Sequence, residues 1–495
     1  MSKSKENIKN GSCPVYKKCG GCQLQNLSYQ KQLEFKQNKV EKLLKRFCRV
    51  EPIIGMNNPY HYRNKVQAAF YTDRRGKIIS GVYQSGTHHV VGIDSCQTED
   101  VTADKIIVAV RGLIPSFKLT TYNEDTHKGF LRHVLVKRGF ATNQVMLVLV
   151  TGTPVFPSKN NFVKAIVKQF PEITTVVQNV NPYNTNLVLG DNEKVLYGKG
   201  YIEDILCGCR FRISPKSFYQ INPVQTEVLY NKAIEFAALK GNETVLDTYC
   251  GIGTIGIIAA KSGAGRVIGV ELNGNAVRDA IVNAKANNLK NIRFYKGDAG
   301  DFMSEASQES EKPDAVFMDP PRAGSSEKFL NALIKMSPKR AVYVSCNPET
   351  LARDIDFLSK NSSYRVQKIQ PVDMFPHTAH IETVVLLSHK KPDGHINVKV
   401  EFGEGEGKVP LDNIAKRAEE YKPKERVTYK MIKEYIEAKY GFKVHTAYIA
   451  EVKRDLGLPM YDAPNAVEEL KQSRKHPTAE KVEAIKDALK HFEVI

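Results

Sequence analysis

Residues 243–260, ETVLDTYCGIGTIGIIAA, decide the fold of this 495-residue chain. An apolar run ends in a glycine-rich turn and a second apolar run with helical spacing follows, so the stretch predicts a strand, a tight turn and a helix. Gly251, Gly253 and Gly256 let the backbone approach a bound ligand closely. Glycines in a turn are a weak signal alone, and the residues that follow decide what they indicate.

Three further apolar runs follow this turn, and each ends at an acidic residue. From residue 224 onward, long helical patterns alternate with such short runs, which is typical of an α/β fold with a doubly wound parallel sheet. The carboxyl ends of parallel strands meet at the edge where these sheets bind ligands, so the acids gather there. The runs are RVIGVEL, IRFYKGDA and DAVFMDPPRAG, and the acids are Glu271, Asp298 and Asp319.

The acids also indicate the kind of cofactor. Glu271 can accept hydrogen bonds from two ribose hydroxyls, which indicates a cofactor that contains a nucleoside. Asp247 places a negative charge where the pyrophosphate of a dinucleotide would sit, so a cationic cofactor suits the turn better. S-adenosylmethionine carries a sulfonium and an ammonium group. The order of strands and loops, with DPP on the fourth strand, resembles the class I methyltransferases.

A cysteine is predicted at the same edge of the sheet. Cys346 follows the apolar run AVYVS, the strand after Asp319. Its thiolate can add to C6 of a uracil, which makes C5 nucleophilic enough to attack a methyl sulfonium. A general base must then remove the C5 proton before the thiolate can leave. Glu382 is the predicted base, with His377 and His380 as competing candidates.

The N-terminal cysteines predict a metal site. Cys13, Cys19 and Cys22 have C-x5-C-x2-C spacing, and the two glycines before Cys22 allow the thiolates to converge. Cys96 is the best candidate for a fourth ligand. Structural zinc and an iron–sulfur cluster both accept four thiolates, so the spacing leaves both open. The nine cysteines of the chain are an odd and scattered set, which argues against a disulfide framework.

The chain carries a formal net charge of +18, and all of this excess lies in residues 1–400. Such a charge predicts a polyanionic partner, because Lys and Arg that neutralise phosphates supply most of the non-specific affinity for nucleic acid. No apolar run reaches the roughly 18 residues that a membrane span needs. The first ten residues are polar, unlike a secretory signal. We therefore expect a cytoplasmic protein that binds nucleic acid and no membrane.

Six motifs occur in an order that resembles the bacterial RNA (uracil-C5)-methyltransferase family, in particular its 23S ribosomal RNA branch with an N-terminal [4Fe-4S] cluster. They are CGGCQ, SFYQIN, DTYCGIGTIG, DPPRAG, SCNPETLARD and HTAHIETV, and the similarity covers about residues 13–390. The resemblance implies that Cys346 is the nucleophile and Glu382 the base. It also implies that Phe218 lies beside the flipped target uracil.

The resemblance further implies two sets of ligands. S-adenosylmethionine would be held by Gln220, Tyr249, Glu271 and Asp319, to which the glycine-rich turn and the third strand add Gly251 and Asp298. The cluster would be held by Cys13, Cys19, Cys22 and Cys96, which favours iron–sulfur over zinc. Thr254 stands where the family often has Asn, so one cofactor contact differs. Family members often begin with a small β-barrel, and only twelve residues precede the first cysteine here, so we expect no barrel.

The predicted architecture combines an α/β methyltransferase domain with a β-rich domain and a helical extension. Residues 60–215 alternate apolar and polar side chains in short runs, and apolar residues recur at helical spacing after the Gly-rich EFGEGEGKVP. The expected parts are a disordered basic tail (1–12), a central RNA-binding domain with the cluster (13–215), the class I methyltransferase domain (216–392), a linker (393–410) and the extension (411–495).

We therefore predict a monomeric enzyme that methylates C5 of a uridine in 23S ribosomal RNA and yields 5-methyluridine. One alternative is the same reaction on transfer RNA. Another is amino-group methylation of a base, whose motif usually has an aromatic residue where this chain has Arg322. A third is an RNA-binding protein with a vestigial methyltransferase site. The resemblance assigns no role to the helical extension.

Overall fold

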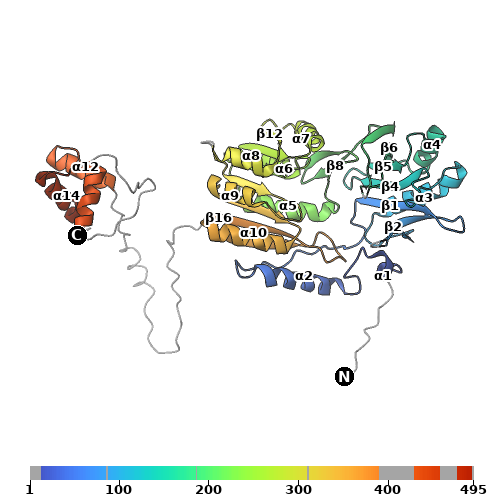
Figure 1. Cartoon of the computed structure of the whole chain (residues 1–495), viewed down its shortest axis with the longest axis horizontal. Helices are drawn as coiled ribbons and strands as arrows, with labels where there is room; N and C mark the ends of the chain where they lie inside the picture. The colour runs from blue at the N-terminus through green and yellow to red at the C-terminus, as the bar shows by residue number, and fades with distance from the viewer. Residues whose placement is uncertain are drawn as a thin grey trace, which may run out of the picture. The chain divides into compact units, whose positions relative to one another are not determined.

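The computed structural model describes residues 13–84, 87–185, 187–308, 312–389, 429–456 and 476–492. The predicted tail at 1–12 and the predicted linker at 393–410 lie outside these residues. The chain divides into two compact units, Met1–Ile396 and Asn397–Ile495, and each is described by itself (Figure 1). Within the described ranges, no helix is both long and apolar enough to cross a membrane.

The first unit contains two large sheets. The one formed by the strands between residues 244 and 389, which we call the catalytic sheet, has seven strands. Its first five strands in spatial order are parallel, as predicted; the sixth pairs antiparallel with the fifth, and the seventh pairs antiparallel with the sixth. The nine residues 373–381 that join these two strands are too few for the helical crossover that a parallel pair needs. The order is β12 (Ile292–Lys296), β11 (Arg266–Glu271), β10 (Thr244–Thr248), β13 (Ala315–Met318), β14 (Arg340–Ser345), β16 (Glu382–His389) and β15 (Tyr364–Val372).

Helices cover both faces of the catalytic sheet (Figure 1). One face packs against α5 (Pro223–Ala237), α6 (Thr254–Lys261) and α7 (Gly274–Ala286). The other face packs against α8 (Ala299–Ala306), α9 (Glu327–Met336) and α10 (Pro348–Asn361). The sequence analysis missed a further helix, α2 (Tyr29–Leu44), whose Val40 and Leu44 are fully buried in the core of the second face. Residues close to the N-terminal cysteines therefore pack on the catalytic sheet.

A second seven-stranded sheet lies beside the first. Helices α3 (Val101–Ser116) and α4 (Lys159–Gln169) cover one of its faces. Its other face shares one core with α5, α6 and the hairpin β8 (Ile202–Leu206) and β9 (Cys209–Ile213). The order is β3 (Val90–Gly92), β2 (Ile78–Tyr83), β1 (Lys65–Thr72), β4 (Leu131–Arg138), β5 (Val145–Thr151), β6 (Ile173–Val180) and β7 (Asn192–Tyr197). The short helix α1 (Tyr16–Cys19) precedes both sheets in the chain.

The described part of the second unit consists of three helices. They are α12 (Tyr429–Tyr440), α13 (Thr446–Asp455) and α14 (Ala479–His491), and their apolar faces form a core of their own. Gly441 follows α12 with a left-handed φ of 72°, a conformation that glycine adopts without strain and that commonly ends a helix. The unit therefore has the local features of a small helical domain.

Candidate active site

A cavity of about 690 Å³ opens at the carboxyl edge of the catalytic sheet. All nine residues that the sequence analysis assigns to catalysis, cofactor binding or substrate binding line it. They are Phe218, Gln220, Tyr249, Gly251, Glu271, Asp298, Asp319, Cys346 and Glu382. The cavity joins the ends of strands β10, β11, β13 and β14 to the start of β16, so residues more than 160 positions apart in the chain meet there.

Strand pairing places Cys346 beside Glu382. In the antiparallel pair of β14 and β16, Ser345 is the register partner of Thr383. Continuing this register by one position brings Cys346, just after β14, opposite Glu382, the first residue of β16. Glu382 is 4% exposed, whereas the Cys346 thiol is half-buried. A nucleophile and a buried carboxyl therefore face the same cavity from neighbouring strands.

The segment after Cys346 holds the loop that follows Asp319. Helix α10 begins with Asn347 as its N-cap, and Asn347 Nδ2 donates to the Arg322 carbonyl at 3.0 Å. The Thr350 hydroxyl donates to the same carbonyl at 3.2 Å, and Arg353 donates to the Ala323 carbonyl at 2.9 Å. These contacts explain why polar residues follow the cysteine, since they orient the neighbouring loop.

The glycine-rich turn forms the other part of the cavity. Asp247 Oδ2 accepts a hydrogen bond of 2.7 Å from the Gly256 backbone N–H. A side chain at position 256 would bring its Cβ to 2.8 Å from that oxygen, so only glycine fits. Glu271 accepts from the Gly251 N–H at 3.0 Å and from the Asn273 N–H at 2.8 Å. The carboxylates of Asp247 in β10 and Glu271 in β11 thus hold the backbone of the glycine-rich turn.

Asp298 has a structural function besides its place in the cavity. It is the N-cap of α8, and its Oδ1 accepts from the Gly300 and Asp301 N–H groups at 2.8 and 3.1 Å. Capping of this kind stabilises a helix by about 1 kcal/mol. The cap uses only Oδ1, so any ligand contact of Asp298 would fall to its other oxygen.

Buried carboxyl groups determine the electrostatics of the cavity. Burial, together with the charges of Asp319 and Glu271, raises the pKa of Asp247 to about 8, although the hydrogen bond from the Gly256 N–H lowers it. Burial alone raises the pKa of Asp319 to about 7. Burial followed by the charge of Asp319 raises the pKa of Glu382 well above its usual value. A positively charged ligand would relieve the repulsion among these groups, as a sulfonium with an ammonium does.

The environment of Cys346 contains opposing charges. Burial, and then Glu382 and Asp319, raise the pKa of the Cys346 thiol to about 11. Arg322 opposes this shift through its charge and a hydrogen bond to the thiol. Cationic groups favour the thiolate, which is the reactive form. The sequence analysis used Arg322 only as an argument against amino-group methylation, so this contact of the side chain is a finding of the structure.

The structure separates the two histidines that compete with Glu382. His380 lines the cavity, whereas His377 is 3% exposed, is not among the lining residues, and contacts Gln32. The geometry therefore leaves Glu382 and His380 as candidates for the base. Tyr230 of α5 and Phe375 also line the cavity. Sequence reasoning missed both, because they follow the same apolar pattern as residues of the core.

The four predicted metal ligands lie around one small cavity. Cys13, Cys19, Cys22 and Cys96 line it together, although Cys96 is 74 residues from Cys22. In the ranges that the structure describes, no three His, Cys, Asp or Glu side chains lie close enough to hold one metal ion. In a cubane cluster each thiolate binds its own iron atom, so the sulfurs surround a wider centre than they do around zinc. Four thiols are the donor set that such a cluster takes.

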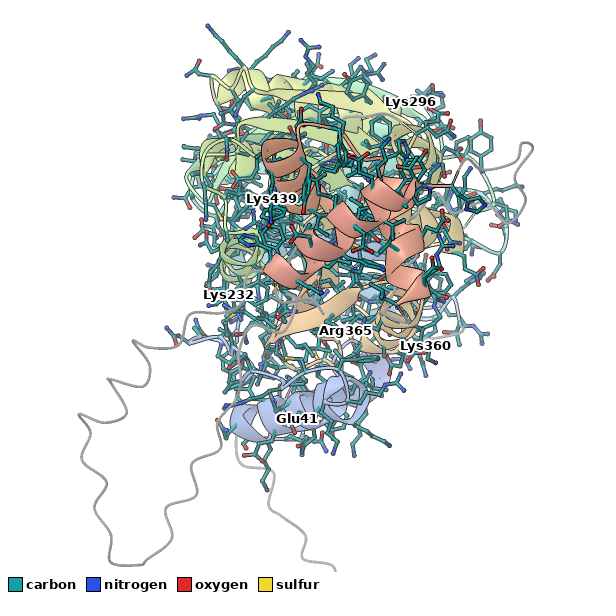
Figure 2. The ribbon with its side chains drawn as sticks, turned by 90° about the vertical axis from the view of Figure 1, so that its left-hand side faces the viewer. Glu41, Lys232, Lys296, Lys360, Arg365 and Lys439 are labelled. Atoms are coloured by element: carbon teal, nitrogen blue, oxygen red, sulfur yellow. The ribbon has the colours of Figure 1, made fainter. Side chains whose placement is uncertain are left out.

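Part of the basic charge of the chain is neutralised locally. Figure 2 shows Lys232, Lys360 and Arg365 on the first unit. Lys232 lies 2.6 Å from a carboxylate oxygen of Glu235, and Lys360 lies 2.6 Å from one of Asp356. Exposed pairs of this kind contribute little to stability. Net charge alone therefore does not mark the side of the molecule that would face RNA.

Comparisons with known proteins agree with one another. A family model described as tRNA (Uracil-5-)-methyltransferase matches residues 184–390. The chain is 45% identical to an RNA methyltransferase of Bacillus cereus over 77% of this chain and 83% of that protein. It is also 45% identical to an RNA methyltransferase of Listeria monocytogenes over 76% of this chain and 83% of that one.

A solved structure supports the same conclusion. The crystal structure of Pyrococcus abyssi tRNA (uracil-54, C5)-methyltransferase in complex with S-adenosyl-L-homocysteine has a TM-score of 0.64 and 33% sequence identity. The similarity covers 74% of this chain and 85% of that chain. The methyltransferase fold and the RNA (uracil-C5)-methyltransferase family predicted from the motifs are thus confirmed, whereas the 23S branch stays a prediction. The chain belongs to the RNA (uracil-5-)-methyltransferase family.

Proposed function

We propose that this protein methylates C5 of a uridine in 23S ribosomal RNA, with S-adenosylmethionine as the methyl donor, to give 5-methyluridine. The observation that carries the proposal is Cys346 opposite the buried Glu382, in a cavity that four further carboxyl groups also line. A thiol is needed to activate C5 of uracil, whereas amino-group methylation needs no covalent adduct. The pair therefore favours the C5 reaction.

The carboxyl-lined part of the cavity would hold the methyl donor. Glu271, at the end of β11, would accept the ribose hydroxyls. Gln220, Tyr249 and Asp319 would bind its remaining polar and cationic groups, with Gly251 and Asp298 beside them. Bound there, S-adenosylmethionine supplies a methyl group on a positively charged sulfur.

Phe218 and Cys346 would receive the target base. Phe218 is 63% exposed and lines the cavity, so its ring is accessible for stacking on a flipped uracil. Cys346 loses its proton to solvent, a step that Arg322 favours, and its sulfur forms a bond to C6 while the C5–C6 double bond opens to an enolate at the C4 carbonyl. The C5–C6 π electrons then make C5 nucleophilic, and C5 takes the methyl group while the donor sulfur keeps the bonding pair.

Glu382 would complete the reaction. Its carboxylate removes the C5 proton, the double bond between C5 and C6 forms again, and the Cys346 thiolate leaves. The step needs Glu382 in its ionised form, and Arg322 opposes the rise in its pKa that burial causes. His380 lines the same cavity and is the alternative base.

The substrate distinguishes two candidate functions. The name of the Pyrococcus abyssi protein specifies uracil 54 of transfer RNA, and that observation favours transfer RNA as the alternative substrate. The four cysteines favour ribosomal RNA, because the transfer-RNA branch that the motifs resemble generally lacks them. We therefore place 23S ribosomal RNA first.

Trapping with 5-fluorouridine tests both the reaction and the substrate. Fluorine at C5 cannot leave as a proton, so the methylated adduct should stay bound to Cys346. Purified protein, S-adenosylmethionine and fluorinated 23S ribosomal RNA should give a shifted band on a denaturing gel, and mass mapping should locate the modified uridine. A band with transfer RNA alone would show that transfer RNA is the substrate and that the proposed reaction is correct. Absence of a band with either RNA would contradict the enzyme and favour an RNA-binding protein with a vestigial site.

We also propose that Cys13, Cys19, Cys22 and Cys96 hold a [4Fe-4S] cluster. Their shared cavity and the family resemblance support this proposal. Protein purified without oxygen should be coloured and contain about four iron atoms per chain. Cys22→Ser should lose most of the iron, whereas Cys48→Ser, a change outside this cavity, should keep it. One zinc ion per chain with little iron would contradict the cluster and show a zinc site instead.

A further inference from the structure

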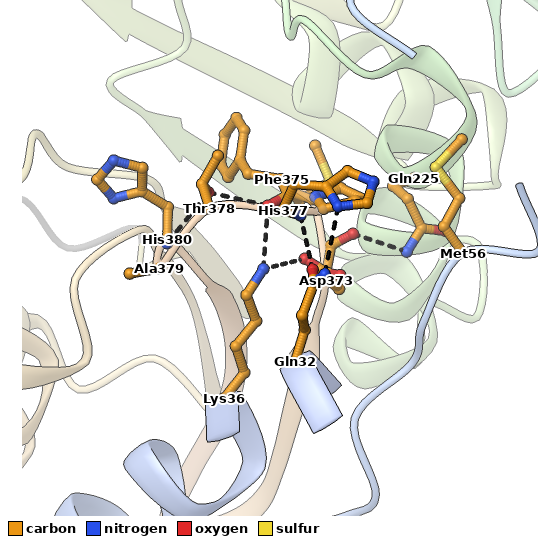
Figure 3. A network of polar contacts seen from close by, with 12 residues as sticks. Gln32, Lys36, Met56, Gln225, Asp373, Phe375, His377, Thr378, Ala379 and His380 are labelled. Carbon is orange, nitrogen blue, oxygen red and sulfur yellow. Dashed lines mark hydrogen bonds and ion pairs between the residues drawn. The ribbon is translucent and has the colours of Figure 1, made fainter. Parts of the chain in front are cut away.

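The loop of residues 373–381, which leads into Glu382, has its backbone held from several sides (Figure 3). Each of the five consecutive carbonyls from Asp373 to His377 accepts a hydrogen bond from a residue outside the loop. The donors are Gln225 to Asp373 (3.0 Å), Asn222 to Met374 (2.9 Å), Lys36 to Phe375 (3.0 Å), Tyr62 to Pro376 (3.0 Å) and Leu24 to His377 (2.9 Å). A loop held at so many points has little freedom to move.

One segment of the chain, residues 23–36, supplies two of these five donors, Leu24 and Lys36, and makes further contacts with the loop. Gln32 Oε1 accepts from the His377 backbone N–H at 2.8 Å, and Gln32 Nε2 lies 3.2 Å from the ring nitrogen Nδ1 of His377. Gln23 Oε1 accepts from the Ala379 N–H at 3.2 Å. We call residues 23–36 the N-terminal clamp.

A buried ion pair joins the clamp to the start of the loop. Lys36 Nζ lies 2.5 Å from Asp373 Oδ1, and both side chains are fully buried. The Tyr29 hydroxyl donates to the other carboxylate oxygen at 2.9 Å. Charges without access to water need such partners, because each unpaired charge would be strongly destabilising. The start of the loop is therefore fixed to helix α2.

The loop contains a strained residue at the position that Gln32 contacts. His377 has a φ of 68°, a left-handed backbone conformation that residues other than glycine rarely adopt. Such a conformation persists where surrounding contacts enforce it, and it often occurs near functional sites. The two contacts of Gln32 and the bond from Leu24 to the His377 carbonyl enforce it here.

We infer that the N-terminal clamp positions Glu382 for removal of the C5 proton, and that Gln32 is a positioning residue for this step. The inference rests on the proposed function, because it takes Glu382 as the base. Ala379 and His377 lie three and five residues before Glu382, so contacts at both set the direction in which β16 begins. A base must lie within hydrogen-bond reach of its proton, and a misplacement of about 1 Å can lower a rate by about 100-fold.

The clamp also connects the cavity lined by the four cysteines to the loop that precedes Glu382. Cys22 lines that cavity and directly precedes Gln23, the first residue of the clamp. The N-terminal end of the clamp is thus anchored where the four cysteines meet. Cysteine ligation would in this way stabilise the base-bearing loop without any electron transfer.

Gln32→Ala tests the inference, with Gln37→Ala as its matched control. Both glutamines lie on α2, but Gln37 bonds to the Ile53 N–H, the Glu51 carbonyl and Glu41, away from the loop. Gln32→Ala should lower kcat at least tenfold and change KM for RNA less than threefold. With unmodified 23S RNA it should also accumulate a methylated covalent adduct on a denaturing gel, because the thiolate cannot leave before the C5 proton is removed. Gln37→Ala should behave like the wild type.

The adduct separates a positioning role from loss of folding. A variant that is only destabilised forms less adduct, whereas a misplaced base leaves more of it. Gln23→Ala removes only an exposed side chain, so it provides the test if Gln32→Ala does not fold, with a smaller accumulation expected. Normal turnover by these variants, or lower turnover without adduct, would overturn the inference. A wild type that forms no adduct with 5-fluorouridine RNA would instead contradict the proposed function.

Discussion

Replacing Cys346 with alanine should lower methyl transfer to RNA by about 10,000-fold or more. The variant lacks the sulfur that activates C5, and loss of a covalent nucleophile commonly costs this much or more. Transfer of a labelled methyl group from S-adenosylmethionine to ribosomal RNA measures the effect. The covalent band with 5-fluorouridine RNA should disappear in parallel.

Cys48→Ala is the matched control for this prediction. The Cys48 thiol is also half-buried, but it donates to the Gln367 carbonyl at 3.4 Å and does not line the active-site cavity. Its removal should leave the methylation rate within about twofold of the wild type. Retention of more than 1% of the activity by Cys346→Ala, with binding of RNA unchanged, would show that the reaction proceeds without this nucleophile.

Replacing Lys36 with methionine should lower the free energy of unfolding of the first unit by about 3–5 kcal/mol. The change keeps most of the volume of the side chain but leaves the Asp373 carboxylate buried without its cation. Removing one member of a buried ion pair typically costs this much. Urea unfolding followed by circular dichroism measures the effect, and the midpoint should fall while the slope stays similar.

A second variant separates the charge from the packing. Lys36→Met combined with Asp373→Asn removes both charges and keeps an acceptor for the Tyr29 hydroxyl. The double variant should be more stable than Lys36→Met alone, because no uncompensated charge remains. A loss below 1 kcal/mol in the single variant would mean that the pair does not hold the loop, and that result would also weaken the clamp.

The residues of the active site were predictable because strand ends carry their own signals. Glu271, Asp298, Asp319 and Cys346 each follow an apolar run, and a parallel sheet brings such ends to one edge. No knowledge of long-range packing is needed for this step. Assigning a role to each residue needed more, namely the chemistry of uracil and the family motifs.

The N-terminal clamp was not predictable in the same way. Helix α2 is rich in Gln, Lys and Glu, so it has no strong apolar stripe to predict a buried face. Its buried Gln32 and Lys36 have partners more than 330 residues away. Periodicity reports local structure, whereas the burial of a polar side chain depends on what the distant chain supplies. The antiparallel end of the catalytic sheet was missed for a related reason, since it depends on the path of the loop at 373–381.

Register, rather than the length of the intervening chain, sets the separation of Cys346 and Glu382. The backbone bonds between β14 and β16 hold these positions opposite each other, while the 35 residues between them pass through α10, β15 and the loop. Insertions at the turn of Ser362 and Ser363, between α10 and β15, would leave the spacing of the reactive groups unchanged. A shift of one residue in β16, in contrast, would point the carboxylate to the opposite face of the sheet.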